Sequence, residues 1–157
     1  MAQRIRARDF GRIVRRRLRR DQRQIEAAAV ESCAQAVGEL VAATDRAGLV
    51  DQGEYRGGWG HHRIPGGAEV GNDAPHADAI EHGRRPGRPG PPLAPIRRWV
   101  ERKIQPPPEQ LDRIAWAIRD KIHREGSPPR LILTSYRPRL LRLFKANVRR
   151  RLSRSGA

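Results

Sequence analysis

The stretch that decides the fold runs from Asp51 to Val100. It contains Asp51-Gln52-Gly53-Glu54-Tyr55-Arg56-Gly57-Gly58-Trp59, then Asn72-Asp73-Ala74-Pro75-His76-Ala77, then Ile80-Glu81-His82-Gly83-Arg84-Arg85-Pro86-Gly87, and finally a proline-rich run into Trp99-Val100. Glycine and proline recur at short intervals, and both mark turns, because glycine accepts positive φ angles and proline fixes φ. The stretch therefore predicts a shaped module of short elements, with no catalytic set among them.

Local signals divide this module into a hairpin, a short helix and an extended connection. Pro65-Gly66-Gly67 predicts a turn between two strands, and residues 72–83 predict a short helix with Pro75 in its first turn and Gly83 at its end. Residues 84–95 hold five prolines and two glycines. Regular structure is excluded there, because proline lacks the N–H group that helices and sheets need.

Helices are expected on both sides of the module. Residues 9–47 carry apolar side chains near helical spacing and are rich in alanine, and Gly48 is the expected stop. Pro95 is placed to open a later helix, and a further helix is expected to end at Gly126. The expected inward faces are Ile96, Trp99, Val100 and Ile104 in the first of these, and Leu111, Ile114, Ala115, Ile118 and Ile122 in the second.

The last residues predict one more strand and one more helix. Leu131–Thr134 is an apolar run typical of a strand, and Pro138 is expected to start the final helix. Together the elements predict an α+β fold with a long N-terminal helix, a small antiparallel hairpin, a proline-rich link and C-terminal helices.

Charge is segregated along a chain whose formal net charge is +16. Residues 1–20 hold nine arginines and one acid, residues 126–157 hold no acid, and residues 50–83 hold six acids against two arginines. Such a distribution suits head-to-tail pairing of copies or contact with a polyanion; a base-composition bias of the genome towards arginine codons is the alternative explanation. We divide the chain into a basic arm or helix start (1–20), a main domain (21–126) and a basic C-terminal helical extension (127–157).

The core that this composition allows is thin. Hydrophobic residues make up 37% and charged residues 32%, with seven aromatic residues in 157. A lone chain would be marginally stable, so burial against sister subunits is expected. Cys33 is the only cysteine, which excludes an internal disulfide. Neither an apolar run of about 18 residues nor a secretory signal is evident, so we expect a cytosolic origin and no contact with membranes.

No residue set for catalysis, a metal or a cofactor is evident. His61 and His62 are adjacent and His76 and His82 lie six apart, so neither pair shares a face of a strand or helix. The Gly-Gly pairs fit neither phosphate-binding loop pattern. We expect a protein that is not an enzyme; a toxin-like or nuclease-like enzyme that uses Glu81 is a rival hypothesis.

Tryptophan and arginine supply the candidate contact residues. Trp59 and Trp99 are expected to anchor a core or an interface, since an indole buries a large area. Trp116 falls off the apolar face of its helix, which favours an inter-subunit contact; an ordinary exposed tryptophan is the alternative. Candidates for contact with DNA or a partner are Arg15, Arg16, Arg17, Arg19, Arg20, Arg149, Arg150 and Arg151. No DNA-binding motif accompanies these arginines, and a solvated charge run is the alternative.

The order of the motifs resembles a family of small tailed-phage morphogenesis proteins of the neck and tail-completion region, of the small head-tail connector type. The resemblance spans about residues 45–125, and His76 stands where the family usually has an aromatic residue. It is carried by Asp51, Gly53, Tyr55, Arg56, Trp59, Asn72–Ala77, Ile80–Gly83, Arg84, Pro86-Gly87, Pro91-Pro92, Pro95-Ile96 and Trp99-Val100.

The resemblance implies a structural virion protein that forms a sixfold ring joining the capsid portal to the tail. Its partners would be itself, portal or adaptor proteins, tail proteins and passing DNA, with the host cytoplasm as the place of assembly. Glu81 would bridge to a sister subunit, with Arg84 or Arg85 as partner, while Trp59 and Trp99 would pack beneath. The expected assembly interface consists of Trp59, Pro75, His76, Glu81, Gly83, Arg84, Arg85 and Trp116. A basic, sequence-independent DNA-binding accessory protein is the alternative function.

Overall fold

The computed structural model describes residues 7–49 and 53–156, so Asp51 and residues 1–6 of the basic arm lie outside the described residues. The predicted α+β fold is confirmed, with a long first helix, a two-stranded antiparallel hairpin and C-terminal helices. The elements are α1 (Ala7–Arg46), α2 (Glu54–Gly57), β1 (Trp59–Ile64), β2 (Gly67–Asn72), α3 (Ala77–His82), α4 (Leu93–Lys103), α5 (Pro108–Glu125) and α6 (Ile132–Gly156).

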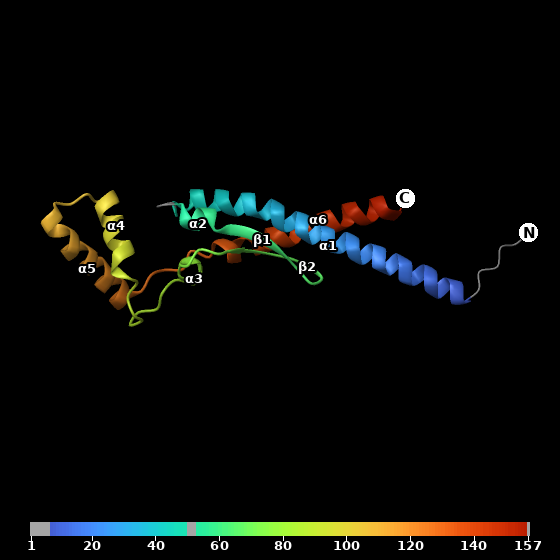
Figure 1. The fold of residues 1–157 in the computed structure, drawn as a ribbon, viewed down its shortest axis with the longest axis horizontal. Coiled ribbons are helices and arrows are strands. Elements are labelled where there is room, and N and C mark those ends of the chain that lie inside the picture. Colours follow the sequence, from blue (N-terminus) through green and yellow to red (C-terminus); the bar gives the residue numbers. More distant parts are fainter. Residues whose placement is uncertain (1–6, 50–52, 157) are drawn as a thin grey trace, which may run out of the picture.

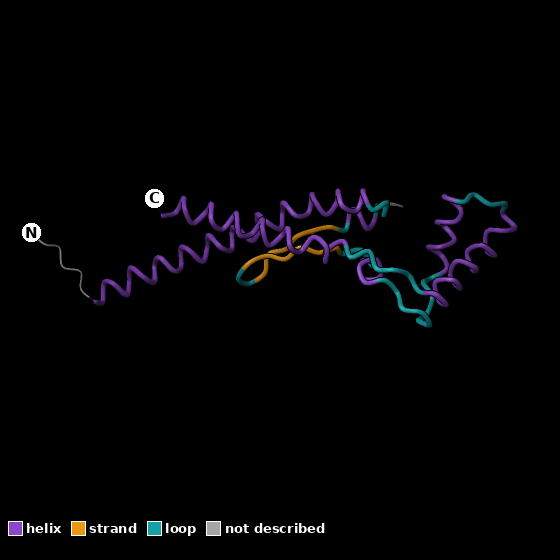
Figure 2. Tube along the Cα trace, turned by 180° about the vertical axis from the view of Figure 1, so that it is seen from behind, coloured by secondary structure: helices purple, strands orange, loops and turns teal. Residues whose placement is uncertain are grey.

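The body of the molecule is elongated: α1 and α6 lie side by side, with the β1–β2 hairpin along them (Figures 1 and 2). The strands pair from Trp59 opposite Asn72 to Ile64 opposite Gly67, so the turn falls at the predicted proline and glycine. Gly66 takes a φ of +82°, which an L side chain rarely adopts. The turn prediction is therefore confirmed.

Four elements meet in the main core of this body. Ala36 and Leu40 of α1, Tyr55 of α2, Trp59 of β1 and Tyr136 of α6 are all buried and pack together. Partly buried apolar side chains from α1, β2, α3 and α6 surround them. The hairpin is held by its packing on α1, because an isolated two-stranded hairpin is marginal in water.

A second, smaller core lies between α4 and α5, which form a helical hairpin at one end of the molecule (Figure 1). Val100, Leu111 and Ala115 are buried there, as the helical pattern predicted. Trp99 and Ile104 are exposed, at 38% and 45%, so their predicted inward position is wrong. A helix packed against one partner buries only a narrow stripe, and Trp99 lies about 100° around the helix from Val100.

The two chain segments that join the body to the α4–α5 hairpin cross at close range. Arg84 and Ser127 exchange both backbone hydrogen bonds, with N···O distances of 3.0 and 2.9 Å. Glycine allows this approach: a Cβ on Gly83 would lie 2.3 Å from the Ser127 oxygen, and one on Gly126 would lie 2.1 Å from the Arg84 oxygen. Both glycines end helices as predicted, whereas the crossing itself has no signal in the sequence.

The prediction of a strand at Leu131–Thr134 and of a helix start at Pro138 is wrong. Helix α6 begins at Ile132 and carries Pro138 inside it. Ile132 and Leu133 face the main core, so tertiary burial converts an apolar run into a first helical turn. The N–H groups of that turn are satisfied by a distant side chain, described below.

The division of the chain at residues 20 and 126 stays a prediction. The structure adds that α6 packs along α1, and its Tyr136 shares a core cluster with Trp59. The part of the chain after residue 127 is therefore integral to the packing of the body.

We predict that Gly83→Ala lowers the free energy of unfolding by at least about 3 kcal/mol, because it combines a positive φ with a steric clash against backbone. Gly87→Ala is the matched control, since Gly87 also has a positive φ of +77° but open space around its Cα. The control is expected to cost only about 1–2 kcal/mol. Chemical denaturation of both variants measures the difference, and equal losses would contradict the crossing.

Candidate assembly interface

Two of the sequence motifs that carry the resemblance, the segment around Tyr55 and the segment Asn72–Ala77, contact each other in the body. Asn72 joins them: its amide Nδ2 donates to the Tyr55 carbonyl at 2.7 Å, and its Oδ1 accepts from the Ala74 N–H at 3.0 Å. Gly58 is required beside it, because a Cβ there would lie 2.4 Å from the Asn72 Oδ1. The two motifs form one interlocked unit.

Trp59 supports this unit from within. Its side chain is buried, and its indole Nε1 donates to the Thr44 hydroxyl oxygen at 2.8 Å. The Thr44 hydroxyl donates in turn to the Leu40 carbonyl at 2.9 Å, so each polar atom has a partner. The Tyr55 ring meets the indole edge-on at 5.6 Å, and burial followed by the charge of Glu81 raises the pKa of Tyr55 to about 12. Of the two predicted roles of Trp59, the structure supports the core anchor.

Glu81 is the polar residue that links this part of the body to α6. Its side chain is 8% exposed, and its carboxylate accepts hydrogen bonds from the backbone N–H groups of Leu133 at 3.1 Å and Thr134 at 2.8 Å. These groups belong to the first turn of α6, where unpaired N–H groups favour an anion. Burial alone would raise the pKa of Glu81, but the hydrogen bonds from Thr134 and Leu133 together lower it below its ordinary value.

Glu81 therefore caps α6 from a separate helix of the same chain. Its predicted partners, Arg84 and Arg85, lie elsewhere: Arg84 donates to the Pro89 carbonyl at 3.5 Å, and Arg85 is exposed. A bridge from Glu81 to a sister subunit stays a prediction, with little exposed carboxylate to support it.

His76 and Pro75 lie on the outside of the unit. Pro75 is exposed, and the His76 ring centroid lies 6.2 Å from that of Tyr55. His76 Nδ1 is 3.8 Å from a Glu54 carboxylate oxygen, and 42% of the histidine side chain is exposed. The imidazole thus packs beside an aromatic ring while one edge faces solvent.

The proline-rich connection is held on α5 by hydrogen bonds of its backbone groups. Arg119 donates to the Pro91 carbonyl at 3.2 Å, the His123 ring nitrogen lies 2.7 Å from the Arg88 carbonyl oxygen, and the Gly87 N–H donates to the His123 carbonyl at 2.7 Å. A segment without regular structure is therefore held in one position along the helix.

Two of the three tryptophans are exposed on the α4–α5 hairpin. Trp116 is 52% exposed, and the Arg119 guanidinium lies 5.0 Å from the centroid of its ring. The prediction that Trp116 falls off the apolar face is confirmed; its role as a contact between subunits stays a prediction. Trp99 adds a second exposed indole, contrary to its expected place beneath the motifs.

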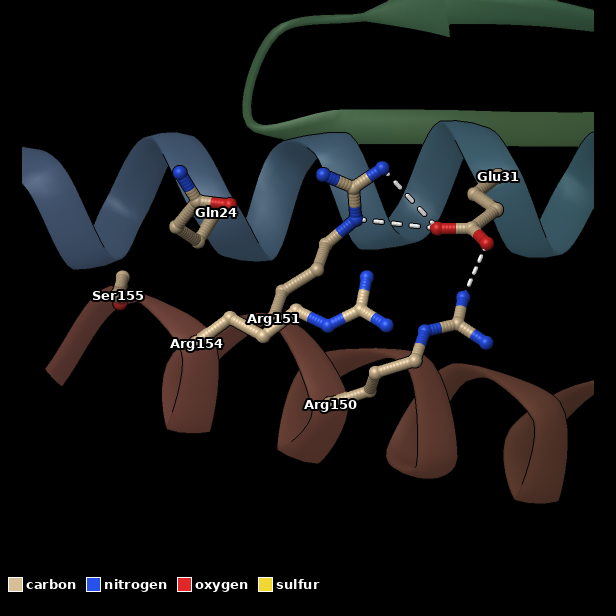
Figure 3. Close-up of a pocket in the computed structure, with 6 residues that line it drawn as sticks. All are labelled: Gln24, Glu31, Arg150, Arg151, Arg154 and Ser155. Atoms are coloured by element: carbon tan, nitrogen blue, oxygen red, sulfur yellow. Dashed lines mark hydrogen bonds and ion pairs between the residues drawn. The ribbon is translucent and has the colours of Figure 1, made fainter. Parts of the chain in front are cut away.

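A basic groove of about 510 Å³ opens between α1 and α6 at the opposite end of the body (Figure 3). Glu31 of α1 is bound on one carboxylate oxygen by Arg150 and on the other by Arg151, at 3.0 Å for the second. Burial acts to raise the pKa of Glu31. The hydrogen bonds from these two arginines act in the opposite direction and outweigh burial, so the pKa lies below its ordinary value. The lining residues are Gln24, Glu31, Arg150, Arg151, Arg154 and Ser155.

A buried polar seam beside this groove was not predicted. Asn147 is 3% exposed, and its amide donates to the Ser32 hydroxyl oxygen at 2.9 Å, while Arg150 donates to the Asn147 Oδ1 at 2.9 Å. The Ser32 hydroxyl donates to the Ala28 carbonyl at 2.7 Å. The sequence offered one signal for it: Asn147 stands four positions after Leu143, so this polar residue falls on the helical face that packs on the core.

The two predicted arginine clusters differ in their surroundings. Arg15, Arg16, Arg17, Arg19 and Arg20 are all exposed on the N-terminal part of α1, whereas Arg150 and Arg151 are engaged with Glu31 and Arg149 is exposed. Arg17 and Arg20 lie 4.0 and 3.9 Å from the Asp21 carboxylate. Ion pairs at such exposure contribute little to stability, so the arginines of this α1 cluster are free to contact an anion.

Comparison with family models, curated proteins and solved structures gave no match. Within the described residues, no helix is both long and apolar enough to cross a membrane. In the same part of the chain, no three histidine, cysteine or acidic side chains lie close enough to hold a metal ion.

We predict that Glu81→Gln lowers the free energy of unfolding by about 1–2 kcal/mol at neutral pH, since the charged cap of α6 is lost. The folded-state pKa of Glu81 lies below its unfolded value, so its contribution is present above the unfolded pKa and is lost as pH falls through the folded one. The difference between variant and wild type should therefore shrink below about pH 4.

Glu101→Gln is the control for this experiment, because the Glu101 side chain is exposed and lies outside the Glu81 site. Urea unfolding at several pH values measures both variants. A pH-independent difference for Glu81→Gln would contradict a charged cap.

Proposed function

We propose that the chain is a structural protein of a tailed phage, which forms a ring in the neck between the capsid portal and the tail. The proposal builds on the resemblance of the motifs in residues 45–125. Its chemistry is assembly: subunits bind one another and the neighbouring layers, and no substrate is turned over.

One observation carries the proposal: the α4–α5 hairpin places exposed apolar side chains at the end of the molecule. Trp99, Ile104 and Trp116 are 38%, 45% and 52% exposed, in a chain with three tryptophans in all. Exposed indoles on a small helical unit favour a protein interface, where tryptophan is enriched in the residues that contribute most binding energy. The crossing at Gly83 and Gly126 connects this unit to the body.

The thin core supports assembly in a second way. The main cluster contains five buried residues, and the contact between α1 and α6 also buries the polar Ser32 and Asn147. Burial against copies of the chain would add apolar contact that the monomer lacks. A ring of identical subunits supplies such contacts repeatedly.

The alternative function, a basic DNA-binding accessory protein, is favoured by the exposed arginines of α1. Arg15, Arg16, Arg17, Arg19 and Arg20 project from a helix that extends past the end of α6 (Figure 1). In this function an isolated monomer would bind duplex DNA without sequence preference and in a salt-dependent way.

We predict that purified particles contain the protein between the capsid vertex and the tail, and that particles made without it have heads and tails that fail to join. Electron cryo-microscopy of both preparations locates the protein. Its absence from the neck of complete particles would refute the proposal.

We predict that Trp99→Ala/Trp116→Ala changes the free energy of unfolding by no more than about 1 kcal/mol, since both indoles are exposed. The same variant should reduce the yield of joined particles by about tenfold or more, because interface tryptophans contribute strongly to binding. Leu141→Ala is the control, as an equally exposed apolar side chain on α6. Full yield from the tryptophan variant would exclude the hairpin as the contact.

For the alternative function, Arg15→Ala/Arg16→Ala/Arg19→Ala should weaken duplex DNA binding. It should flatten the salt dependence of the binding constant by about 0.9 logarithmic units per lost phosphate contact. Arg113→Ala/Arg137→Ala/Arg142→Ala removes three other exposed arginines and serves as the control. Titration of labelled DNA at several salt concentrations measures the slope, and an unchanged slope would remove this alternative.

A further inference from the structure

We infer that the ring closes through a head-to-tail ionic contact, in which the basic end of one copy binds the acidic edge of the next. The inference rests on the proposed ring and names its contact surfaces. The partner of the basic groove is thus a carboxylate-rich edge of a second copy of this chain.

The basic end is a fork formed where α1 and α6 diverge (Figures 1 and 2). Figure 3 shows Arg150 and Arg151 reaching from α6 to Glu31 of α1, while the Arg154 side chain lies along α6 beside them. Arg17 and Arg20 precede Gln24 by seven and four residues, so they continue the same face of α1 beyond the groove. We call these five arginines the basic fork: Arg17, Arg20, Arg150, Arg151 and Arg154.

The fork keeps positive charge after its internal pairing. Glu31 neutralises one charge at its floor and Asp21 a second at its rim, which leaves three of the five arginine charges unbalanced. Arg154 lines the groove, and its side chain is exposed. The groove therefore suits a small number of carboxylates that approach between the two helices.

The acidic edge lies at the other end of the body and consists of Glu54, Asp73 and Asp78. Their side chains are 68%, 77% and 93% exposed. Each lies near a histidine: Glu54 is 3.8 Å from His76, Asp73 is 3.5 Å from His62, and Asp78 is 2.9 Å from His82. The three carboxylates supply three negative charges, which equal the excess of the fork.

Five other acids among the described residues are paired with arginines. Glu31, Glu39, Asp45, Asp112 and Asp120 each bind an arginine of the same chain. In a chain with 33 basic residues, the acidic edge is thus set apart by its histidine neighbours. Its carboxylates face solvent with their charge available to a partner.

One copy cannot bring its own fork and edge together. Arg56, two residues after Glu54, binds Asp45 of α1 at 2.7 Å, whereas Gln24 marks the groove. The 21 residues of α1 between Asp45 and Gln24 span about 32 Å at 1.5 Å per residue. That distance exceeds the screening length of about 8 Å at physiological salt, so the two surfaces attract each other only between copies.

The arrangement of unlike charges within one chain favours a protein edge at the fork. Arg150 and Arg151 already pair with Glu31 at the floor of the groove, so the positive charge left for a partner is small and local. Two unlike surfaces at opposite ends of a subunit are also what a head-to-tail contact requires, and such contacts form a ring when the rotation between successive copies closes.

An exchange of charges tests the contact. The fork variant Arg20→Glu/Arg154→Glu carries acidic groups at both ends, and the edge variant Asp73→Arg/Asp78→Arg carries basic groups at both ends. Each alone should associate at least about tenfold more weakly than wild type, because like charges then face each other. An equimolar mixture should restore association, since every contact in an alternating ring pairs opposite charges.

Sedimentation velocity of the full chain measures association, at salt concentrations of about 50 and 500 mM to separate screened from unscreened attraction. Matched controls reverse exposed charges elsewhere: Arg113→Glu/Arg142→Glu for the fork variant and Glu101→Arg/Glu109→Arg for the edge variant. Both controls should associate as wild type does, and circular dichroism should confirm that all four variants are folded.

Three results would overturn the inference: a wild-type chain that stays monomeric at low salt, a single variant that assembles like wild type, or a mixture that fails to recover. Loss of duplex DNA binding by the fork variant, without recovery of assembly in the mixture, would assign the fork to nucleic acid instead. The ring in the neck is tested separately by the position of the protein in particles. A failed exchange would refute the contact alone, and a protein missing from the neck would refute the ring alone.

Discussion

The close approach of two chain segments at Gly83 and Gly126 is the constraint on which the remaining structure depends. A single backbone hydrogen-bond pair between Arg84 and Ser127 holds the body and the α4–α5 hairpin together at this point. Just before it, Glu81 binds the first turn of α6, so the same few residues set the start of the last helix. Hydrogen bonds of the backbone and of the Glu81 carboxylate thus hold the start of α6 and the base of the α4–α5 hairpin, in addition to the contacts of the small apolar core.

Polar contacts also define how α1 and α6 meet. Ser32 and Asn147 are buried between the helices, and Glu31 and Glu39 each bind arginines from α6. Such contacts favour one register of two long helices, because a shift would leave buried polar groups without partners. The arginine excess of the chain therefore has two uses: part of it aligns the helices, and part remains on the surface.

The long helices, the hairpin and the turns were predictable because their signals are local. Pro65 and Gly66 determine the hairpin turn, Gly48 follows the end of α1, and the apolar spacing from Leu111 to Ile122 gives α5. The start of α6 was not predictable, since Glu81 lies about fifty residues away from the N–H groups it binds. Burial of Trp99 was wrongly expected because periodicity does not reveal how many neighbours a helix has.

In the candidate assembly interface, too, only the features with a local sequence signal were predictable. The sequence located Trp116 outside its apolar face and singled out Glu81 as a polar bridge, but nothing local identified the backbone N–H groups that Glu81 binds. The role of Asn147 was missed because a single polar residue in a helix has no distinctive pattern. Contacts between residues far apart in the chain account for each of these gaps.

The crossing has one more consequence. Since Arg84 and Ser127 are hydrogen-bonded to each other, the intervening segment leaves the body and returns to it at the same place. That segment has its own apolar cluster around Val100, so it meets the requirements of an inserted unit. Over evolution, its length and surface can diverge or be exchanged between lineages while the body stays the same, provided that the two glycines persist.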